Sequence, residues 1–223
     1  MVKKIIFMKS NTIRVKYLLK FGQKQDMENL FNKGEVYMNT IKLFQELDKP
    51  GVGDKLEGTF EITNFREGKL TLEIPDNPIT LNPKKIQLRK KLKGHIGNIY
   101  STYALSDELL KRKAIHRIDK RMLEFGPHCV IVKDVGKFIS LVLEKLHEKD
   151  FLNSHNLVKY YDYNRNNHDL SLFNKSHIFS YQKEHRIIAN TNIDEPIKFE
   201  IGSMHEYAEL HSAENLIKNS IFR

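Results

Sequence analysis

Hydrophobic and polar residues alternate in several short runs along the chain, and such alternation is the pattern of β-strands with one buried face. The clearest run spans residues 13–21, where five apolar residues share one parity and basic residues occupy most of the other. We therefore predict a half-buried strand over this run. Similar alternating or short apolar runs predict further strands over residues 35–38, 59–64, 70–74, 99–105, 129–132, 158–163, 185–190 and 196–201.

Other segments place their apolar residues at helical spacing. In residues 135–147, Phe138, Val142 and Leu146 recur every four residues and fall on one face of a helix. Gly34 follows another such segment at the position of a left-handed C-cap. We predict helices over residues 25–31, 41–47, 107–125, 135–147 and 213–218, and a turn or short helix over residues 170–176.

The order of these elements predicts the fold class. Strands and helices intermix without repeats and without strict βαβ alternation, which is typical of α+β proteins. The turn at residues 66–68 predicts a hairpin between the strands on either side of it. Residues 83–94 carry six Lys or Arg and predict a basic linker or short helix, and residues 49–54 form the clearest loop. We expect one α+β domain over residues 1–223, with mixed or antiparallel sheets and flanking helices.

Composition and charge indicate the kind of partner and the cellular compartment of the protein. Lys and Arg number 37 against 28 acidic residues, a formal charge of +9, which favours an anionic partner. The single cysteine, Cys129, lies in an apolar run, so we expect a buried, inert thiol and a reducing compartment. Apolar runs fall short of the ~18 residues of a membrane span, and the N-terminal run is too short for a signal peptide. We expect a cytoplasmic protein without a membrane partner.

Several kinds of chemistry are disfavoured by the motifs. The ten histidines include no pair at the i, i+4 spacing of a metalloprotease helix, and one cysteine excludes thiolate zinc sites. We therefore predict no metal site. The chain also has no Walker loop, no glycine fingerprint of a dinucleotide-binding fold and no Gly-x-Ser-x-Gly elbow.

Three short segments point to a different chemistry. They are a basic first strand that begins near Arg14, the tripeptide Ser101-Thr102-Tyr103 on a middle strand, and Gln182-Lys183-Glu184 at the start of a late strand. In this order they resemble the ADP-ribosyltransferases of the arginine, serine, glutamate type. The resemblance implies a fold like that of those enzymes, NAD as the bound nucleotide, and transfer of ADP-ribose to an acceptor.

The resemblance also implies a role for each residue. Cleavage of the bond between nicotinamide and ribose develops positive charge on the sugar, which the carboxylate of Glu184 would stabilise. Gln182, two residues away on an extended segment, would face the same pocket and orient the acceptor. Arg14 would clamp the pyrophosphate, a role for which Lys16 and Lys20 are alternatives.

The middle-strand residues complete this assignment. Ser101 or Thr102 would fix the strand and the carboxylate by hydrogen bonds, and Tyr103 stands where these enzymes usually have a second serine, beside the bound NAD. We expect Glu184 to be an exposed carboxylate whose replacement leaves stability nearly unchanged. The simpler interpretation is that Glu184 and Arg186 form a solvent-facing pair, with Ser101 and Thr102 as ordinary strand residues.

A second resemblance covers more of the chain. Motifs spread along the sequence look like those of a family of uncharacterised bacterial and phage proteins that are often found among mobile elements. These motifs are residues 20–22, 34–37, Phe44, 53–58, 173–175 and 181–187. The resemblance implies a defence, counter-defence or toxin setting but no particular reaction. Asp54 and Glu57 would form a second acidic site in such proteins, or they mark a turn and the start of a strand.

Two basic runs support a rival hypothesis. Residues 84–93 and 111–121 each carry six Lys or Arg, which could neutralise phosphates of DNA or RNA. Tyr100 and Tyr103 lie between the runs and could stack on bases. On this hypothesis the chain is a noncatalytic nucleic-acid-binding or protein-inhibiting module. Its main contacts would be Lys90, Lys91, Arg112 and Lys113.

Overall fold

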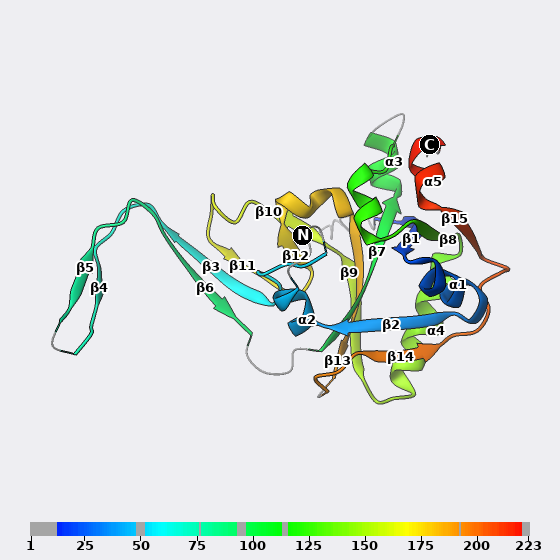
Figure 1. Ribbon diagram of the computed structural model, residues 1–223, viewed down its shortest axis with the longest axis horizontal. Coiled ribbons are helices and arrows are strands. Elements are labelled where there is room, and N and C mark those ends of the chain that lie inside the picture. Colours follow the sequence, from blue (N-terminus) through cyan, green and yellow to red (C-terminus); the bar gives the residue numbers. More distant parts are fainter. Residues whose placement is uncertain are drawn as a thin grey trace, which may run out of the picture.

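An antiparallel sheet forms the centre of the molecule in the computed structural model, which describes residues 13–47, 52–75, 77–92, 97–112, 116–191 and 193–219 (Figure 1). Among these residues the sheet has eight strands. They are β1 (Val15–Gly22), β2 (Glu35–Thr40), β7 (Asn98–Ser106), β8 (His128–Val132), β9 (Leu152–Leu157), β13 (Glu184–Asn190), β14 (Ile197–Glu200) and β15 (Ala208–Ser212). β7 pairs with β13 on one edge and with both β1 and β2 on the other.

Helices pack on both faces of this sheet. They are α1 (Lys24–Lys33), α2 (Ile41–Glu46), α3 (Asp107–Arg112), α4 (Val135–His147) and α5 (Ala213–Asn219), with 3-10 helices η1 (Lys120–Phe125) and η2 (His177–Gln182). Leu18 of β1 packs with α1 and α4 on one face, whereas the adjacent Leu19 packs with η1 and α5 on the other. Both leucines are completely buried. The prediction of a half-buried first strand is therefore wrong at its centre, because helices cover both faces.

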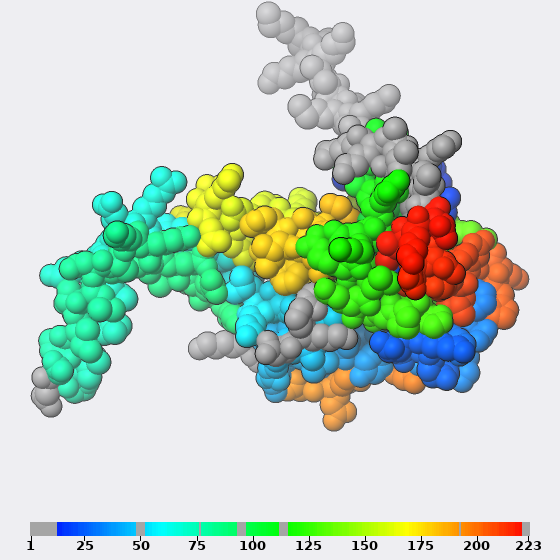
Figure 2. All heavy atoms as spheres, turned by 45° about the horizontal axis from the view of Figure 1, so that its top comes forward, coloured from blue at the N-terminus to red at the C-terminus, as the bar shows by residue number. Residues whose placement is uncertain are grey.

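A long β-arm projects from this body, as Figures 1 and 2 both show. Its base contains β3 (Thr59–Phe65), β6 (Ile86–Lys91) and the short β11 (His168–Asp169), and its tip contains β4 (Leu70–Leu72) and β5 (Ile79–Leu81). Beside the base, β10 (Lys159–Tyr161) and β12 (Asn174–Ser176) pair in parallel. The molecule is thus an α+β domain with largely antiparallel sheets, as the sequence predicted.

Most elements of the body were predicted correctly. The structure confirms strands β1, β2, β7, β8, β13 and β14 and helices α1, α2, α4 and α5 within a few residues of their predicted ends. Gly34 adopts the expected left-handed conformation, with φ of +67°, and its N–H bonds to carbonyls of the last turn of α1. Cys129 is fully buried, and burial raises the pKa of its thiol.

The predicted hairpin in the arm is wrong. β3 pairs with β6 and β4 pairs with β5, so β3 and β4 are successive parts of one strand path that bends at the turn. The basic segment forms the regular strand β6 rather than a linker or helix. Its charges are accommodated by exposure and by a cross-strand ion pair, in which Lys90 Nζ lies 2.7 Å from Glu61 Oε2.

The long helix predicted over residues 107–125 is also wrong. α3 ends at Arg112, His116 forms an isolated β-bridge, and η1 begins only at Lys120. Asp119 caps η1 by accepting a hydrogen bond from the N–H of Arg121, so it starts a new helical turn instead of continuing the first. The predicted strand over residues 158–163 is reduced to β10, and the predicted turn over 170–176 ends in β12. Strands β5, β9, β11 and β15 were not predicted.

Candidate functional site

Along one of its edges, the central strand β7 pairs with two different strands, β1 and β2. On that edge Tyr103 pairs with Leu19 of β1, whereas Ile99 pairs with Asn39 of β2. β13 pairs with both β7 residues along the opposite edge. β1 and β2 therefore separate beside Ser101, and a pocket lies in this split.

Lys20 enters the split from β1. Its Nζ donates a hydrogen bond of 2.8 Å to the carbonyl oxygen of Ser101 and lies 4.3 Å from the ring centroid of Tyr100. Lys20 therefore supplies to β7 the hydrogen-bond donor that a neighbouring strand would otherwise provide. Burial lowers the pKa of Lys20 to about 8, against the opposing effects of Glu184 and Asp26.

The pocket has a volume of about 180 Å³ and combines an apolar wall with a charged one. The apolar wall includes Phe44, Met122 and Phe125. The charged and polar wall includes Lys20, Glu57, Ser101, Lys175, Gln182, Glu184 and Arg186. Ionised groups of both signs thus meet at the edge of the apolar core.

Glu184 is held by two cations. Its Oε1 accepts a hydrogen bond of 2.8 Å from Lys175 Nζ, and its Oε2 accepts one of 2.8 Å from Arg186 Nε. The two terminal nitrogens of Arg186 bind both oxygens of Glu57, each at 2.8 Å, in a bidentate pair. Lys175 also donates to Gln182 Oε1 at 2.8 Å. We call these five residues the Arg186 network.

Glu184 and Arg186 keep their charges in the interior. Burial alone would raise the pKa of Glu184, but Arg186 and Lys175 outweigh burial and hold it well below its usual value. Burial would also lower the pKa of Arg186, but Glu184 and Glu57 raise it instead. Outside the network, burial and the charge of Glu57 raise the pKa of Asp54. Glu184 is therefore a carboxylate at neutral pH.

The structure brings together most of the residues of the predicted site. Ser101, Thr102, Tyr103, Gln182 and Glu184 all line the pocket in the split. Gln182, however, ends a 3-10 helix, so the reason given for its position, an extended segment with period two, is wrong. The left-handed Lys183 that follows, with φ of 43°, and the shared contact with Lys175 place Gln182 beside Glu184.

The hydroxyl groups of the middle strand have other partners. Thr102 Oγ1 donates to the carbonyl oxygen of His185 at 3.3 Å, which ties β7 to β13. The hydroxyl oxygen of Tyr103 lies 2.6 Å from His116 Nε2. The hydrogen bonds described above for Glu184 come from Lys175 and Arg186 rather than from Ser101 or Thr102.

Glu184 and Arg186 do not face solvent. The exposed fractions of their side chains are 7% and 2%, so the interpretation as a solvent-facing pair is wrong. The expectation that replacement of Glu184 leaves stability nearly unchanged assumed an exposed carboxylate, and the structure contradicts that premise. Loss of a buried carboxylate leaves cations without their partner.

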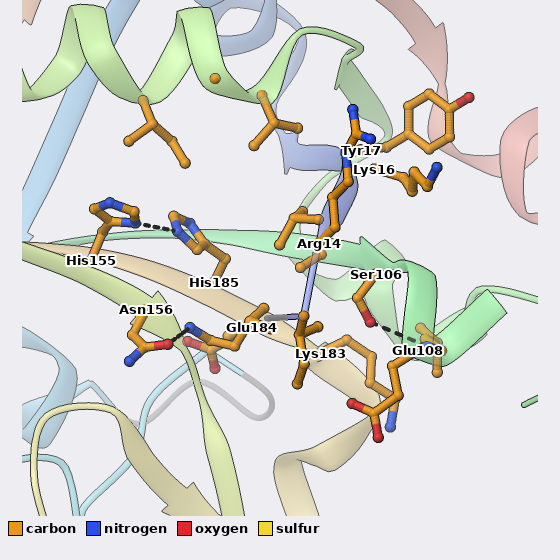
Figure 3. Close-up of a pocket in the computed structure, with 18 of the residues that line it drawn as sticks. Arg14, Lys16, Tyr17, Ser106, Glu108, His155, Asn156, Lys183, Glu184 and His185 are labelled. Carbon is orange, nitrogen blue, oxygen red and sulfur yellow. Dashed lines mark hydrogen bonds between the residues drawn. The ribbon is translucent and has the colours of Figure 1, made fainter. Parts of the chain in front are cut away.

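Arg14 lies elsewhere. It lines a second, larger pocket of about 1570 Å³, together with Lys16, Lys183 and His155 (Figure 3). Glu184 lines both pockets, whereas Arg14 is not part of the wall of the smaller one. Of the three basic candidates on the first strand, Lys20 is the residue that reaches the split.

Little in the sequence indicated the positions of three further residues in or near the pocket, Asp54, Glu57 and Lys175. Asp54 and Glu57 were singled out as acidic, and both are buried, but the pairing of Glu57 with Arg186 was not predicted. Asp54 caps a turn by accepting from the N–H of Leu56, as the simpler interpretation expected. Lys175 was noted only within a motif, and its position opposite Glu184 depends on the parallel pairing of β10 with β12.

The residues predicted to bind nucleic acid do not gather at this pocket. Lys90 and Lys91 lie on β6 in the arm, where Lys90 pairs with Glu61 and Lys91 donates to the carbonyl oxygen of Lys55. Arg112 ends α3 on the body, away from the arm in Figure 1. Lys113 lies outside the described residues.

Within the described ranges, no three His, Cys, Asp or Glu residues are placed to hold a metal ion. None of the helices in this part of the chain combines the length and the apolar character that a bilayer-spanning helix needs. No family model, curated protein or solved structure matches the chain.

Proposed function

We propose that the chain transfers ADP-ribose from NAD to an acceptor at the pocket in the split sheet. The observation that carries this proposal is that Ser101, which lies far from Gln182 and Glu184 in sequence, lines the same pocket as these two residues. The resemblance of the mobile-element motifs suggests a phage defence, counter-defence or toxin setting for this activity.

The proposed reaction needs a carboxylate that stays ionised. The bond between C1′ of the ribose and the nicotinamide nitrogen breaks, and its electron pair leaves with the neutral nicotinamide. A lone pair of the acceptor forms the new bond to C1′, and the acceptor releases a proton to solvent. Positive charge builds on the sugar in between, and Glu184, whose pKa is held low, can stabilise it.

Lys175 and Arg186 would position this carboxylate. Each oxygen of Glu184 uses one lone pair on a cation, and each retains another that can point to a ligand. Lys175 also holds Gln182, so the amide and the carboxylate are fixed relative to each other. Lys20 takes the role first proposed for Arg14, as the cation of the first strand at the pocket.

The size of the pocket limits which part of NAD it holds. A volume of 180 Å³ is below the ~300–1,000 Å³ of typical sites for drug-sized ligands. It suits one ring, such as nicotinamide, against the apolar wall that includes Phe44 and Phe125. The phosphates would then lie outside the pocket, and Lys20 is the cation of the first strand that lines it.

Release of nicotinamide from NAD by the purified protein, and labelling of an acceptor from NAD labelled in its adenylate part, test the proposal. Glu184→Gln keeps the shape of the side chain but removes its charge, so we expect a rate loss of about 100-fold or more. The matched control is Glu200→Gln, which changes an exposed carboxylate on β14 outside the pocket.

Because Glu184 is buried, its variant is assayed well below its own melting temperature, with the fold checked by circular dichroism. Lys20→Met provides a second test, since we expect it to weaken NAD binding. A folded wild-type chain that neither binds NAD nor releases nicotinamide would refute the proposal, as would full activity of folded Glu184→Gln.

A further inference from the structure

The tip of the arm, which we call the distal hairpin, comprises the described residues 69–75 and 77–82. Its two strands pair Leu70 with Leu81 and Leu72 with Ile79. Because alternate residues of a strand share a face, these four apolar side chains lie on one face. On the opposite face, the hydroxyl oxygens of Thr71 and Thr80 lie 3.3 Å apart.

The apolar face is exposed to solvent. The exposed fractions of Leu72, Ile79 and Leu81 are 43%, 41% and 47%. Among the described residues, β4 and β5 form a sheet of their own, with no third strand. An isolated two-stranded hairpin is marginally stable in water, and three or more strands with an apolar face are needed for independent stability.

The two outer edges of the distal hairpin differ. β5 lies between Pro78 and Pro83, and proline, which has no N–H, commonly protects a sheet edge from pairing. β4 is flanked instead by Lys69 and Glu73, both exposed. Neither of these two side chains has an ion-pair or hydrogen-bond partner within the described part of the chain. The β4 edge is therefore open to another strand.

The sequence of the β4 edge is complementary to itself. If a second copy of Lys69-Leu70-Thr71-Leu72-Glu73 runs antiparallel to the first with Thr71 at the centre, Lys69 of each copy lies opposite Glu73 of the other. Leu70 then lies opposite Leu72, and Thr71 opposite Thr71. Opposite charges and apolar pairs directly across two strands both stabilise the pairing.

We propose that the distal hairpin binds a second copy of this chain by antiparallel pairing of the two β4 edges. The product is a four-stranded sheet in the order β5, β4, β4, β5, with two Lys69–Glu73 pairs on one face and a continuous apolar face on the other. The edge pairing is short, so the association is weak and reversible. The proposal is independent of the proposed enzymatic activity.

Cysteine crosslinking tests the register. In the proposed dimer, the two copies of Thr71 face each other with Cα atoms about 4.5–5.5 Å apart, within the range that a disulfide can span. We expect Thr71→Cys to form a covalent dimer under mild oxidation with diamide. The matched control is Thr80→Cys, which lies on the same face but on the proline-flanked strand, and it should not crosslink. Wild type, whose Cys129 is buried, gives the background.

Charge reversal tests the specificity. In the Thr71→Cys background, Glu73→Lys places two lysines opposite each other, so we expect crosslinking to slow roughly fivefold. The double change Lys69→Glu with Glu73→Lys restores opposite charges and should restore the rate. Circular dichroism confirms that each variant is folded.

Three outcomes would overturn the proposal. One is equal crosslinking of Thr71→Cys and Thr80→Cys, which indicates random collision. Another is no rescue by the double charge change. The third is a Thr71→Cys chain that stays monomeric under oxidation at several hundred micromolar, in which case the β4 edge serves a different protein or no partner.

Discussion

Globular proteins usually bury apolar residues and expose charged ones, and the Arg186 network and the distal hairpin each break one half of this rule. The network places full charges in the interior, whereas the hairpin places leucine and isoleucine in solvent. Each buried charge has a partner at 2.8 Å, because an unpaired charge in the interior costs several kcal/mol. The exposed apolar residues face no such penalty. The two regions therefore differ in how strongly the fold depends on them, and substitutions can measure that difference.

The largest effect should come from Arg186→Met. This change removes the side chain that pairs with both Glu57 and Glu184, and leaves Glu57 buried without its cation. We expect the free energy of unfolding to fall by about 3–5 kcal/mol. Urea denaturation followed by circular dichroism measures it. A loss below about 1 kcal/mol would mean that water reaches these carboxylates and that the network is not a buried structural element.

A smaller effect should come from pH, through His185. This residue lines the larger pocket, where its Nε2 is 3.2 Å from His155 Nδ1 (Figure 3). Burial, and to a lesser extent His155, lower the pKa of His185 to about 4 from its usual 6.5. The unfolded chain therefore binds a proton first as pH falls, and this residue's contribution to stability is lost between about pH 6.5 and 4.

Between pH 7 and pH 5 we expect His185 to account for a loss of about 2 kcal/mol in the free energy of unfolding. Urea denaturation at the two pH values measures the total loss, to which other groups also contribute. His185→Asn, which cannot be protonated in this range, should show a loss smaller by that amount. An identical pH dependence in the variant and wild type would contradict the lowered pKa.

The smallest effect should come from Lys90→Met in the arm. Lys90 pairs with Glu61 at 2.7 Å, but 63% of the side chain of Lys90 is exposed, so water and salt screen the pair. We expect the urea midpoint to stay within experimental error of the wild-type value. A clear loss of stability would show that the base of the arm contributes to the folding of the body.

Sequence patterns predicted most elements of the body but not the strand pairing of the arm. Helix α4 was predicted with its exact ends because its apolar residues follow a strict helical spacing and Asp134 caps it. The pairing of β3 was missed because the sequence shows which residues form strands but not which strands meet. A turn at residues 66–68 fits both a tight hairpin and the bend between β3 and β4 that the structure shows.

The candidate site was predicted in part for the same reason. Ser101, Gln182 and Glu184 were recognised because they lie in short motifs with a known order. Lys175 and Glu57 carry no local signal for their roles, since each approaches Glu184 or Arg186 only through the tertiary fold. Burial of Glu184 could not be predicted either, because alternation indicates one buried face and β13 is buried along almost all of its length.

The position of β7 has a consequence for the synthesis of the chain. Tyr103 of β7 pairs with Leu19 on one edge and with Glu184 on the other, so residues from both ends of the chain meet at its centre. Such long-range pairing forms slowly, because a large loop must close before any stabilising contact can form. A ribosome releases β1 and β7 well before β13. The nascent chain must therefore keep this edge of its central strand unpaired until β13 has been made.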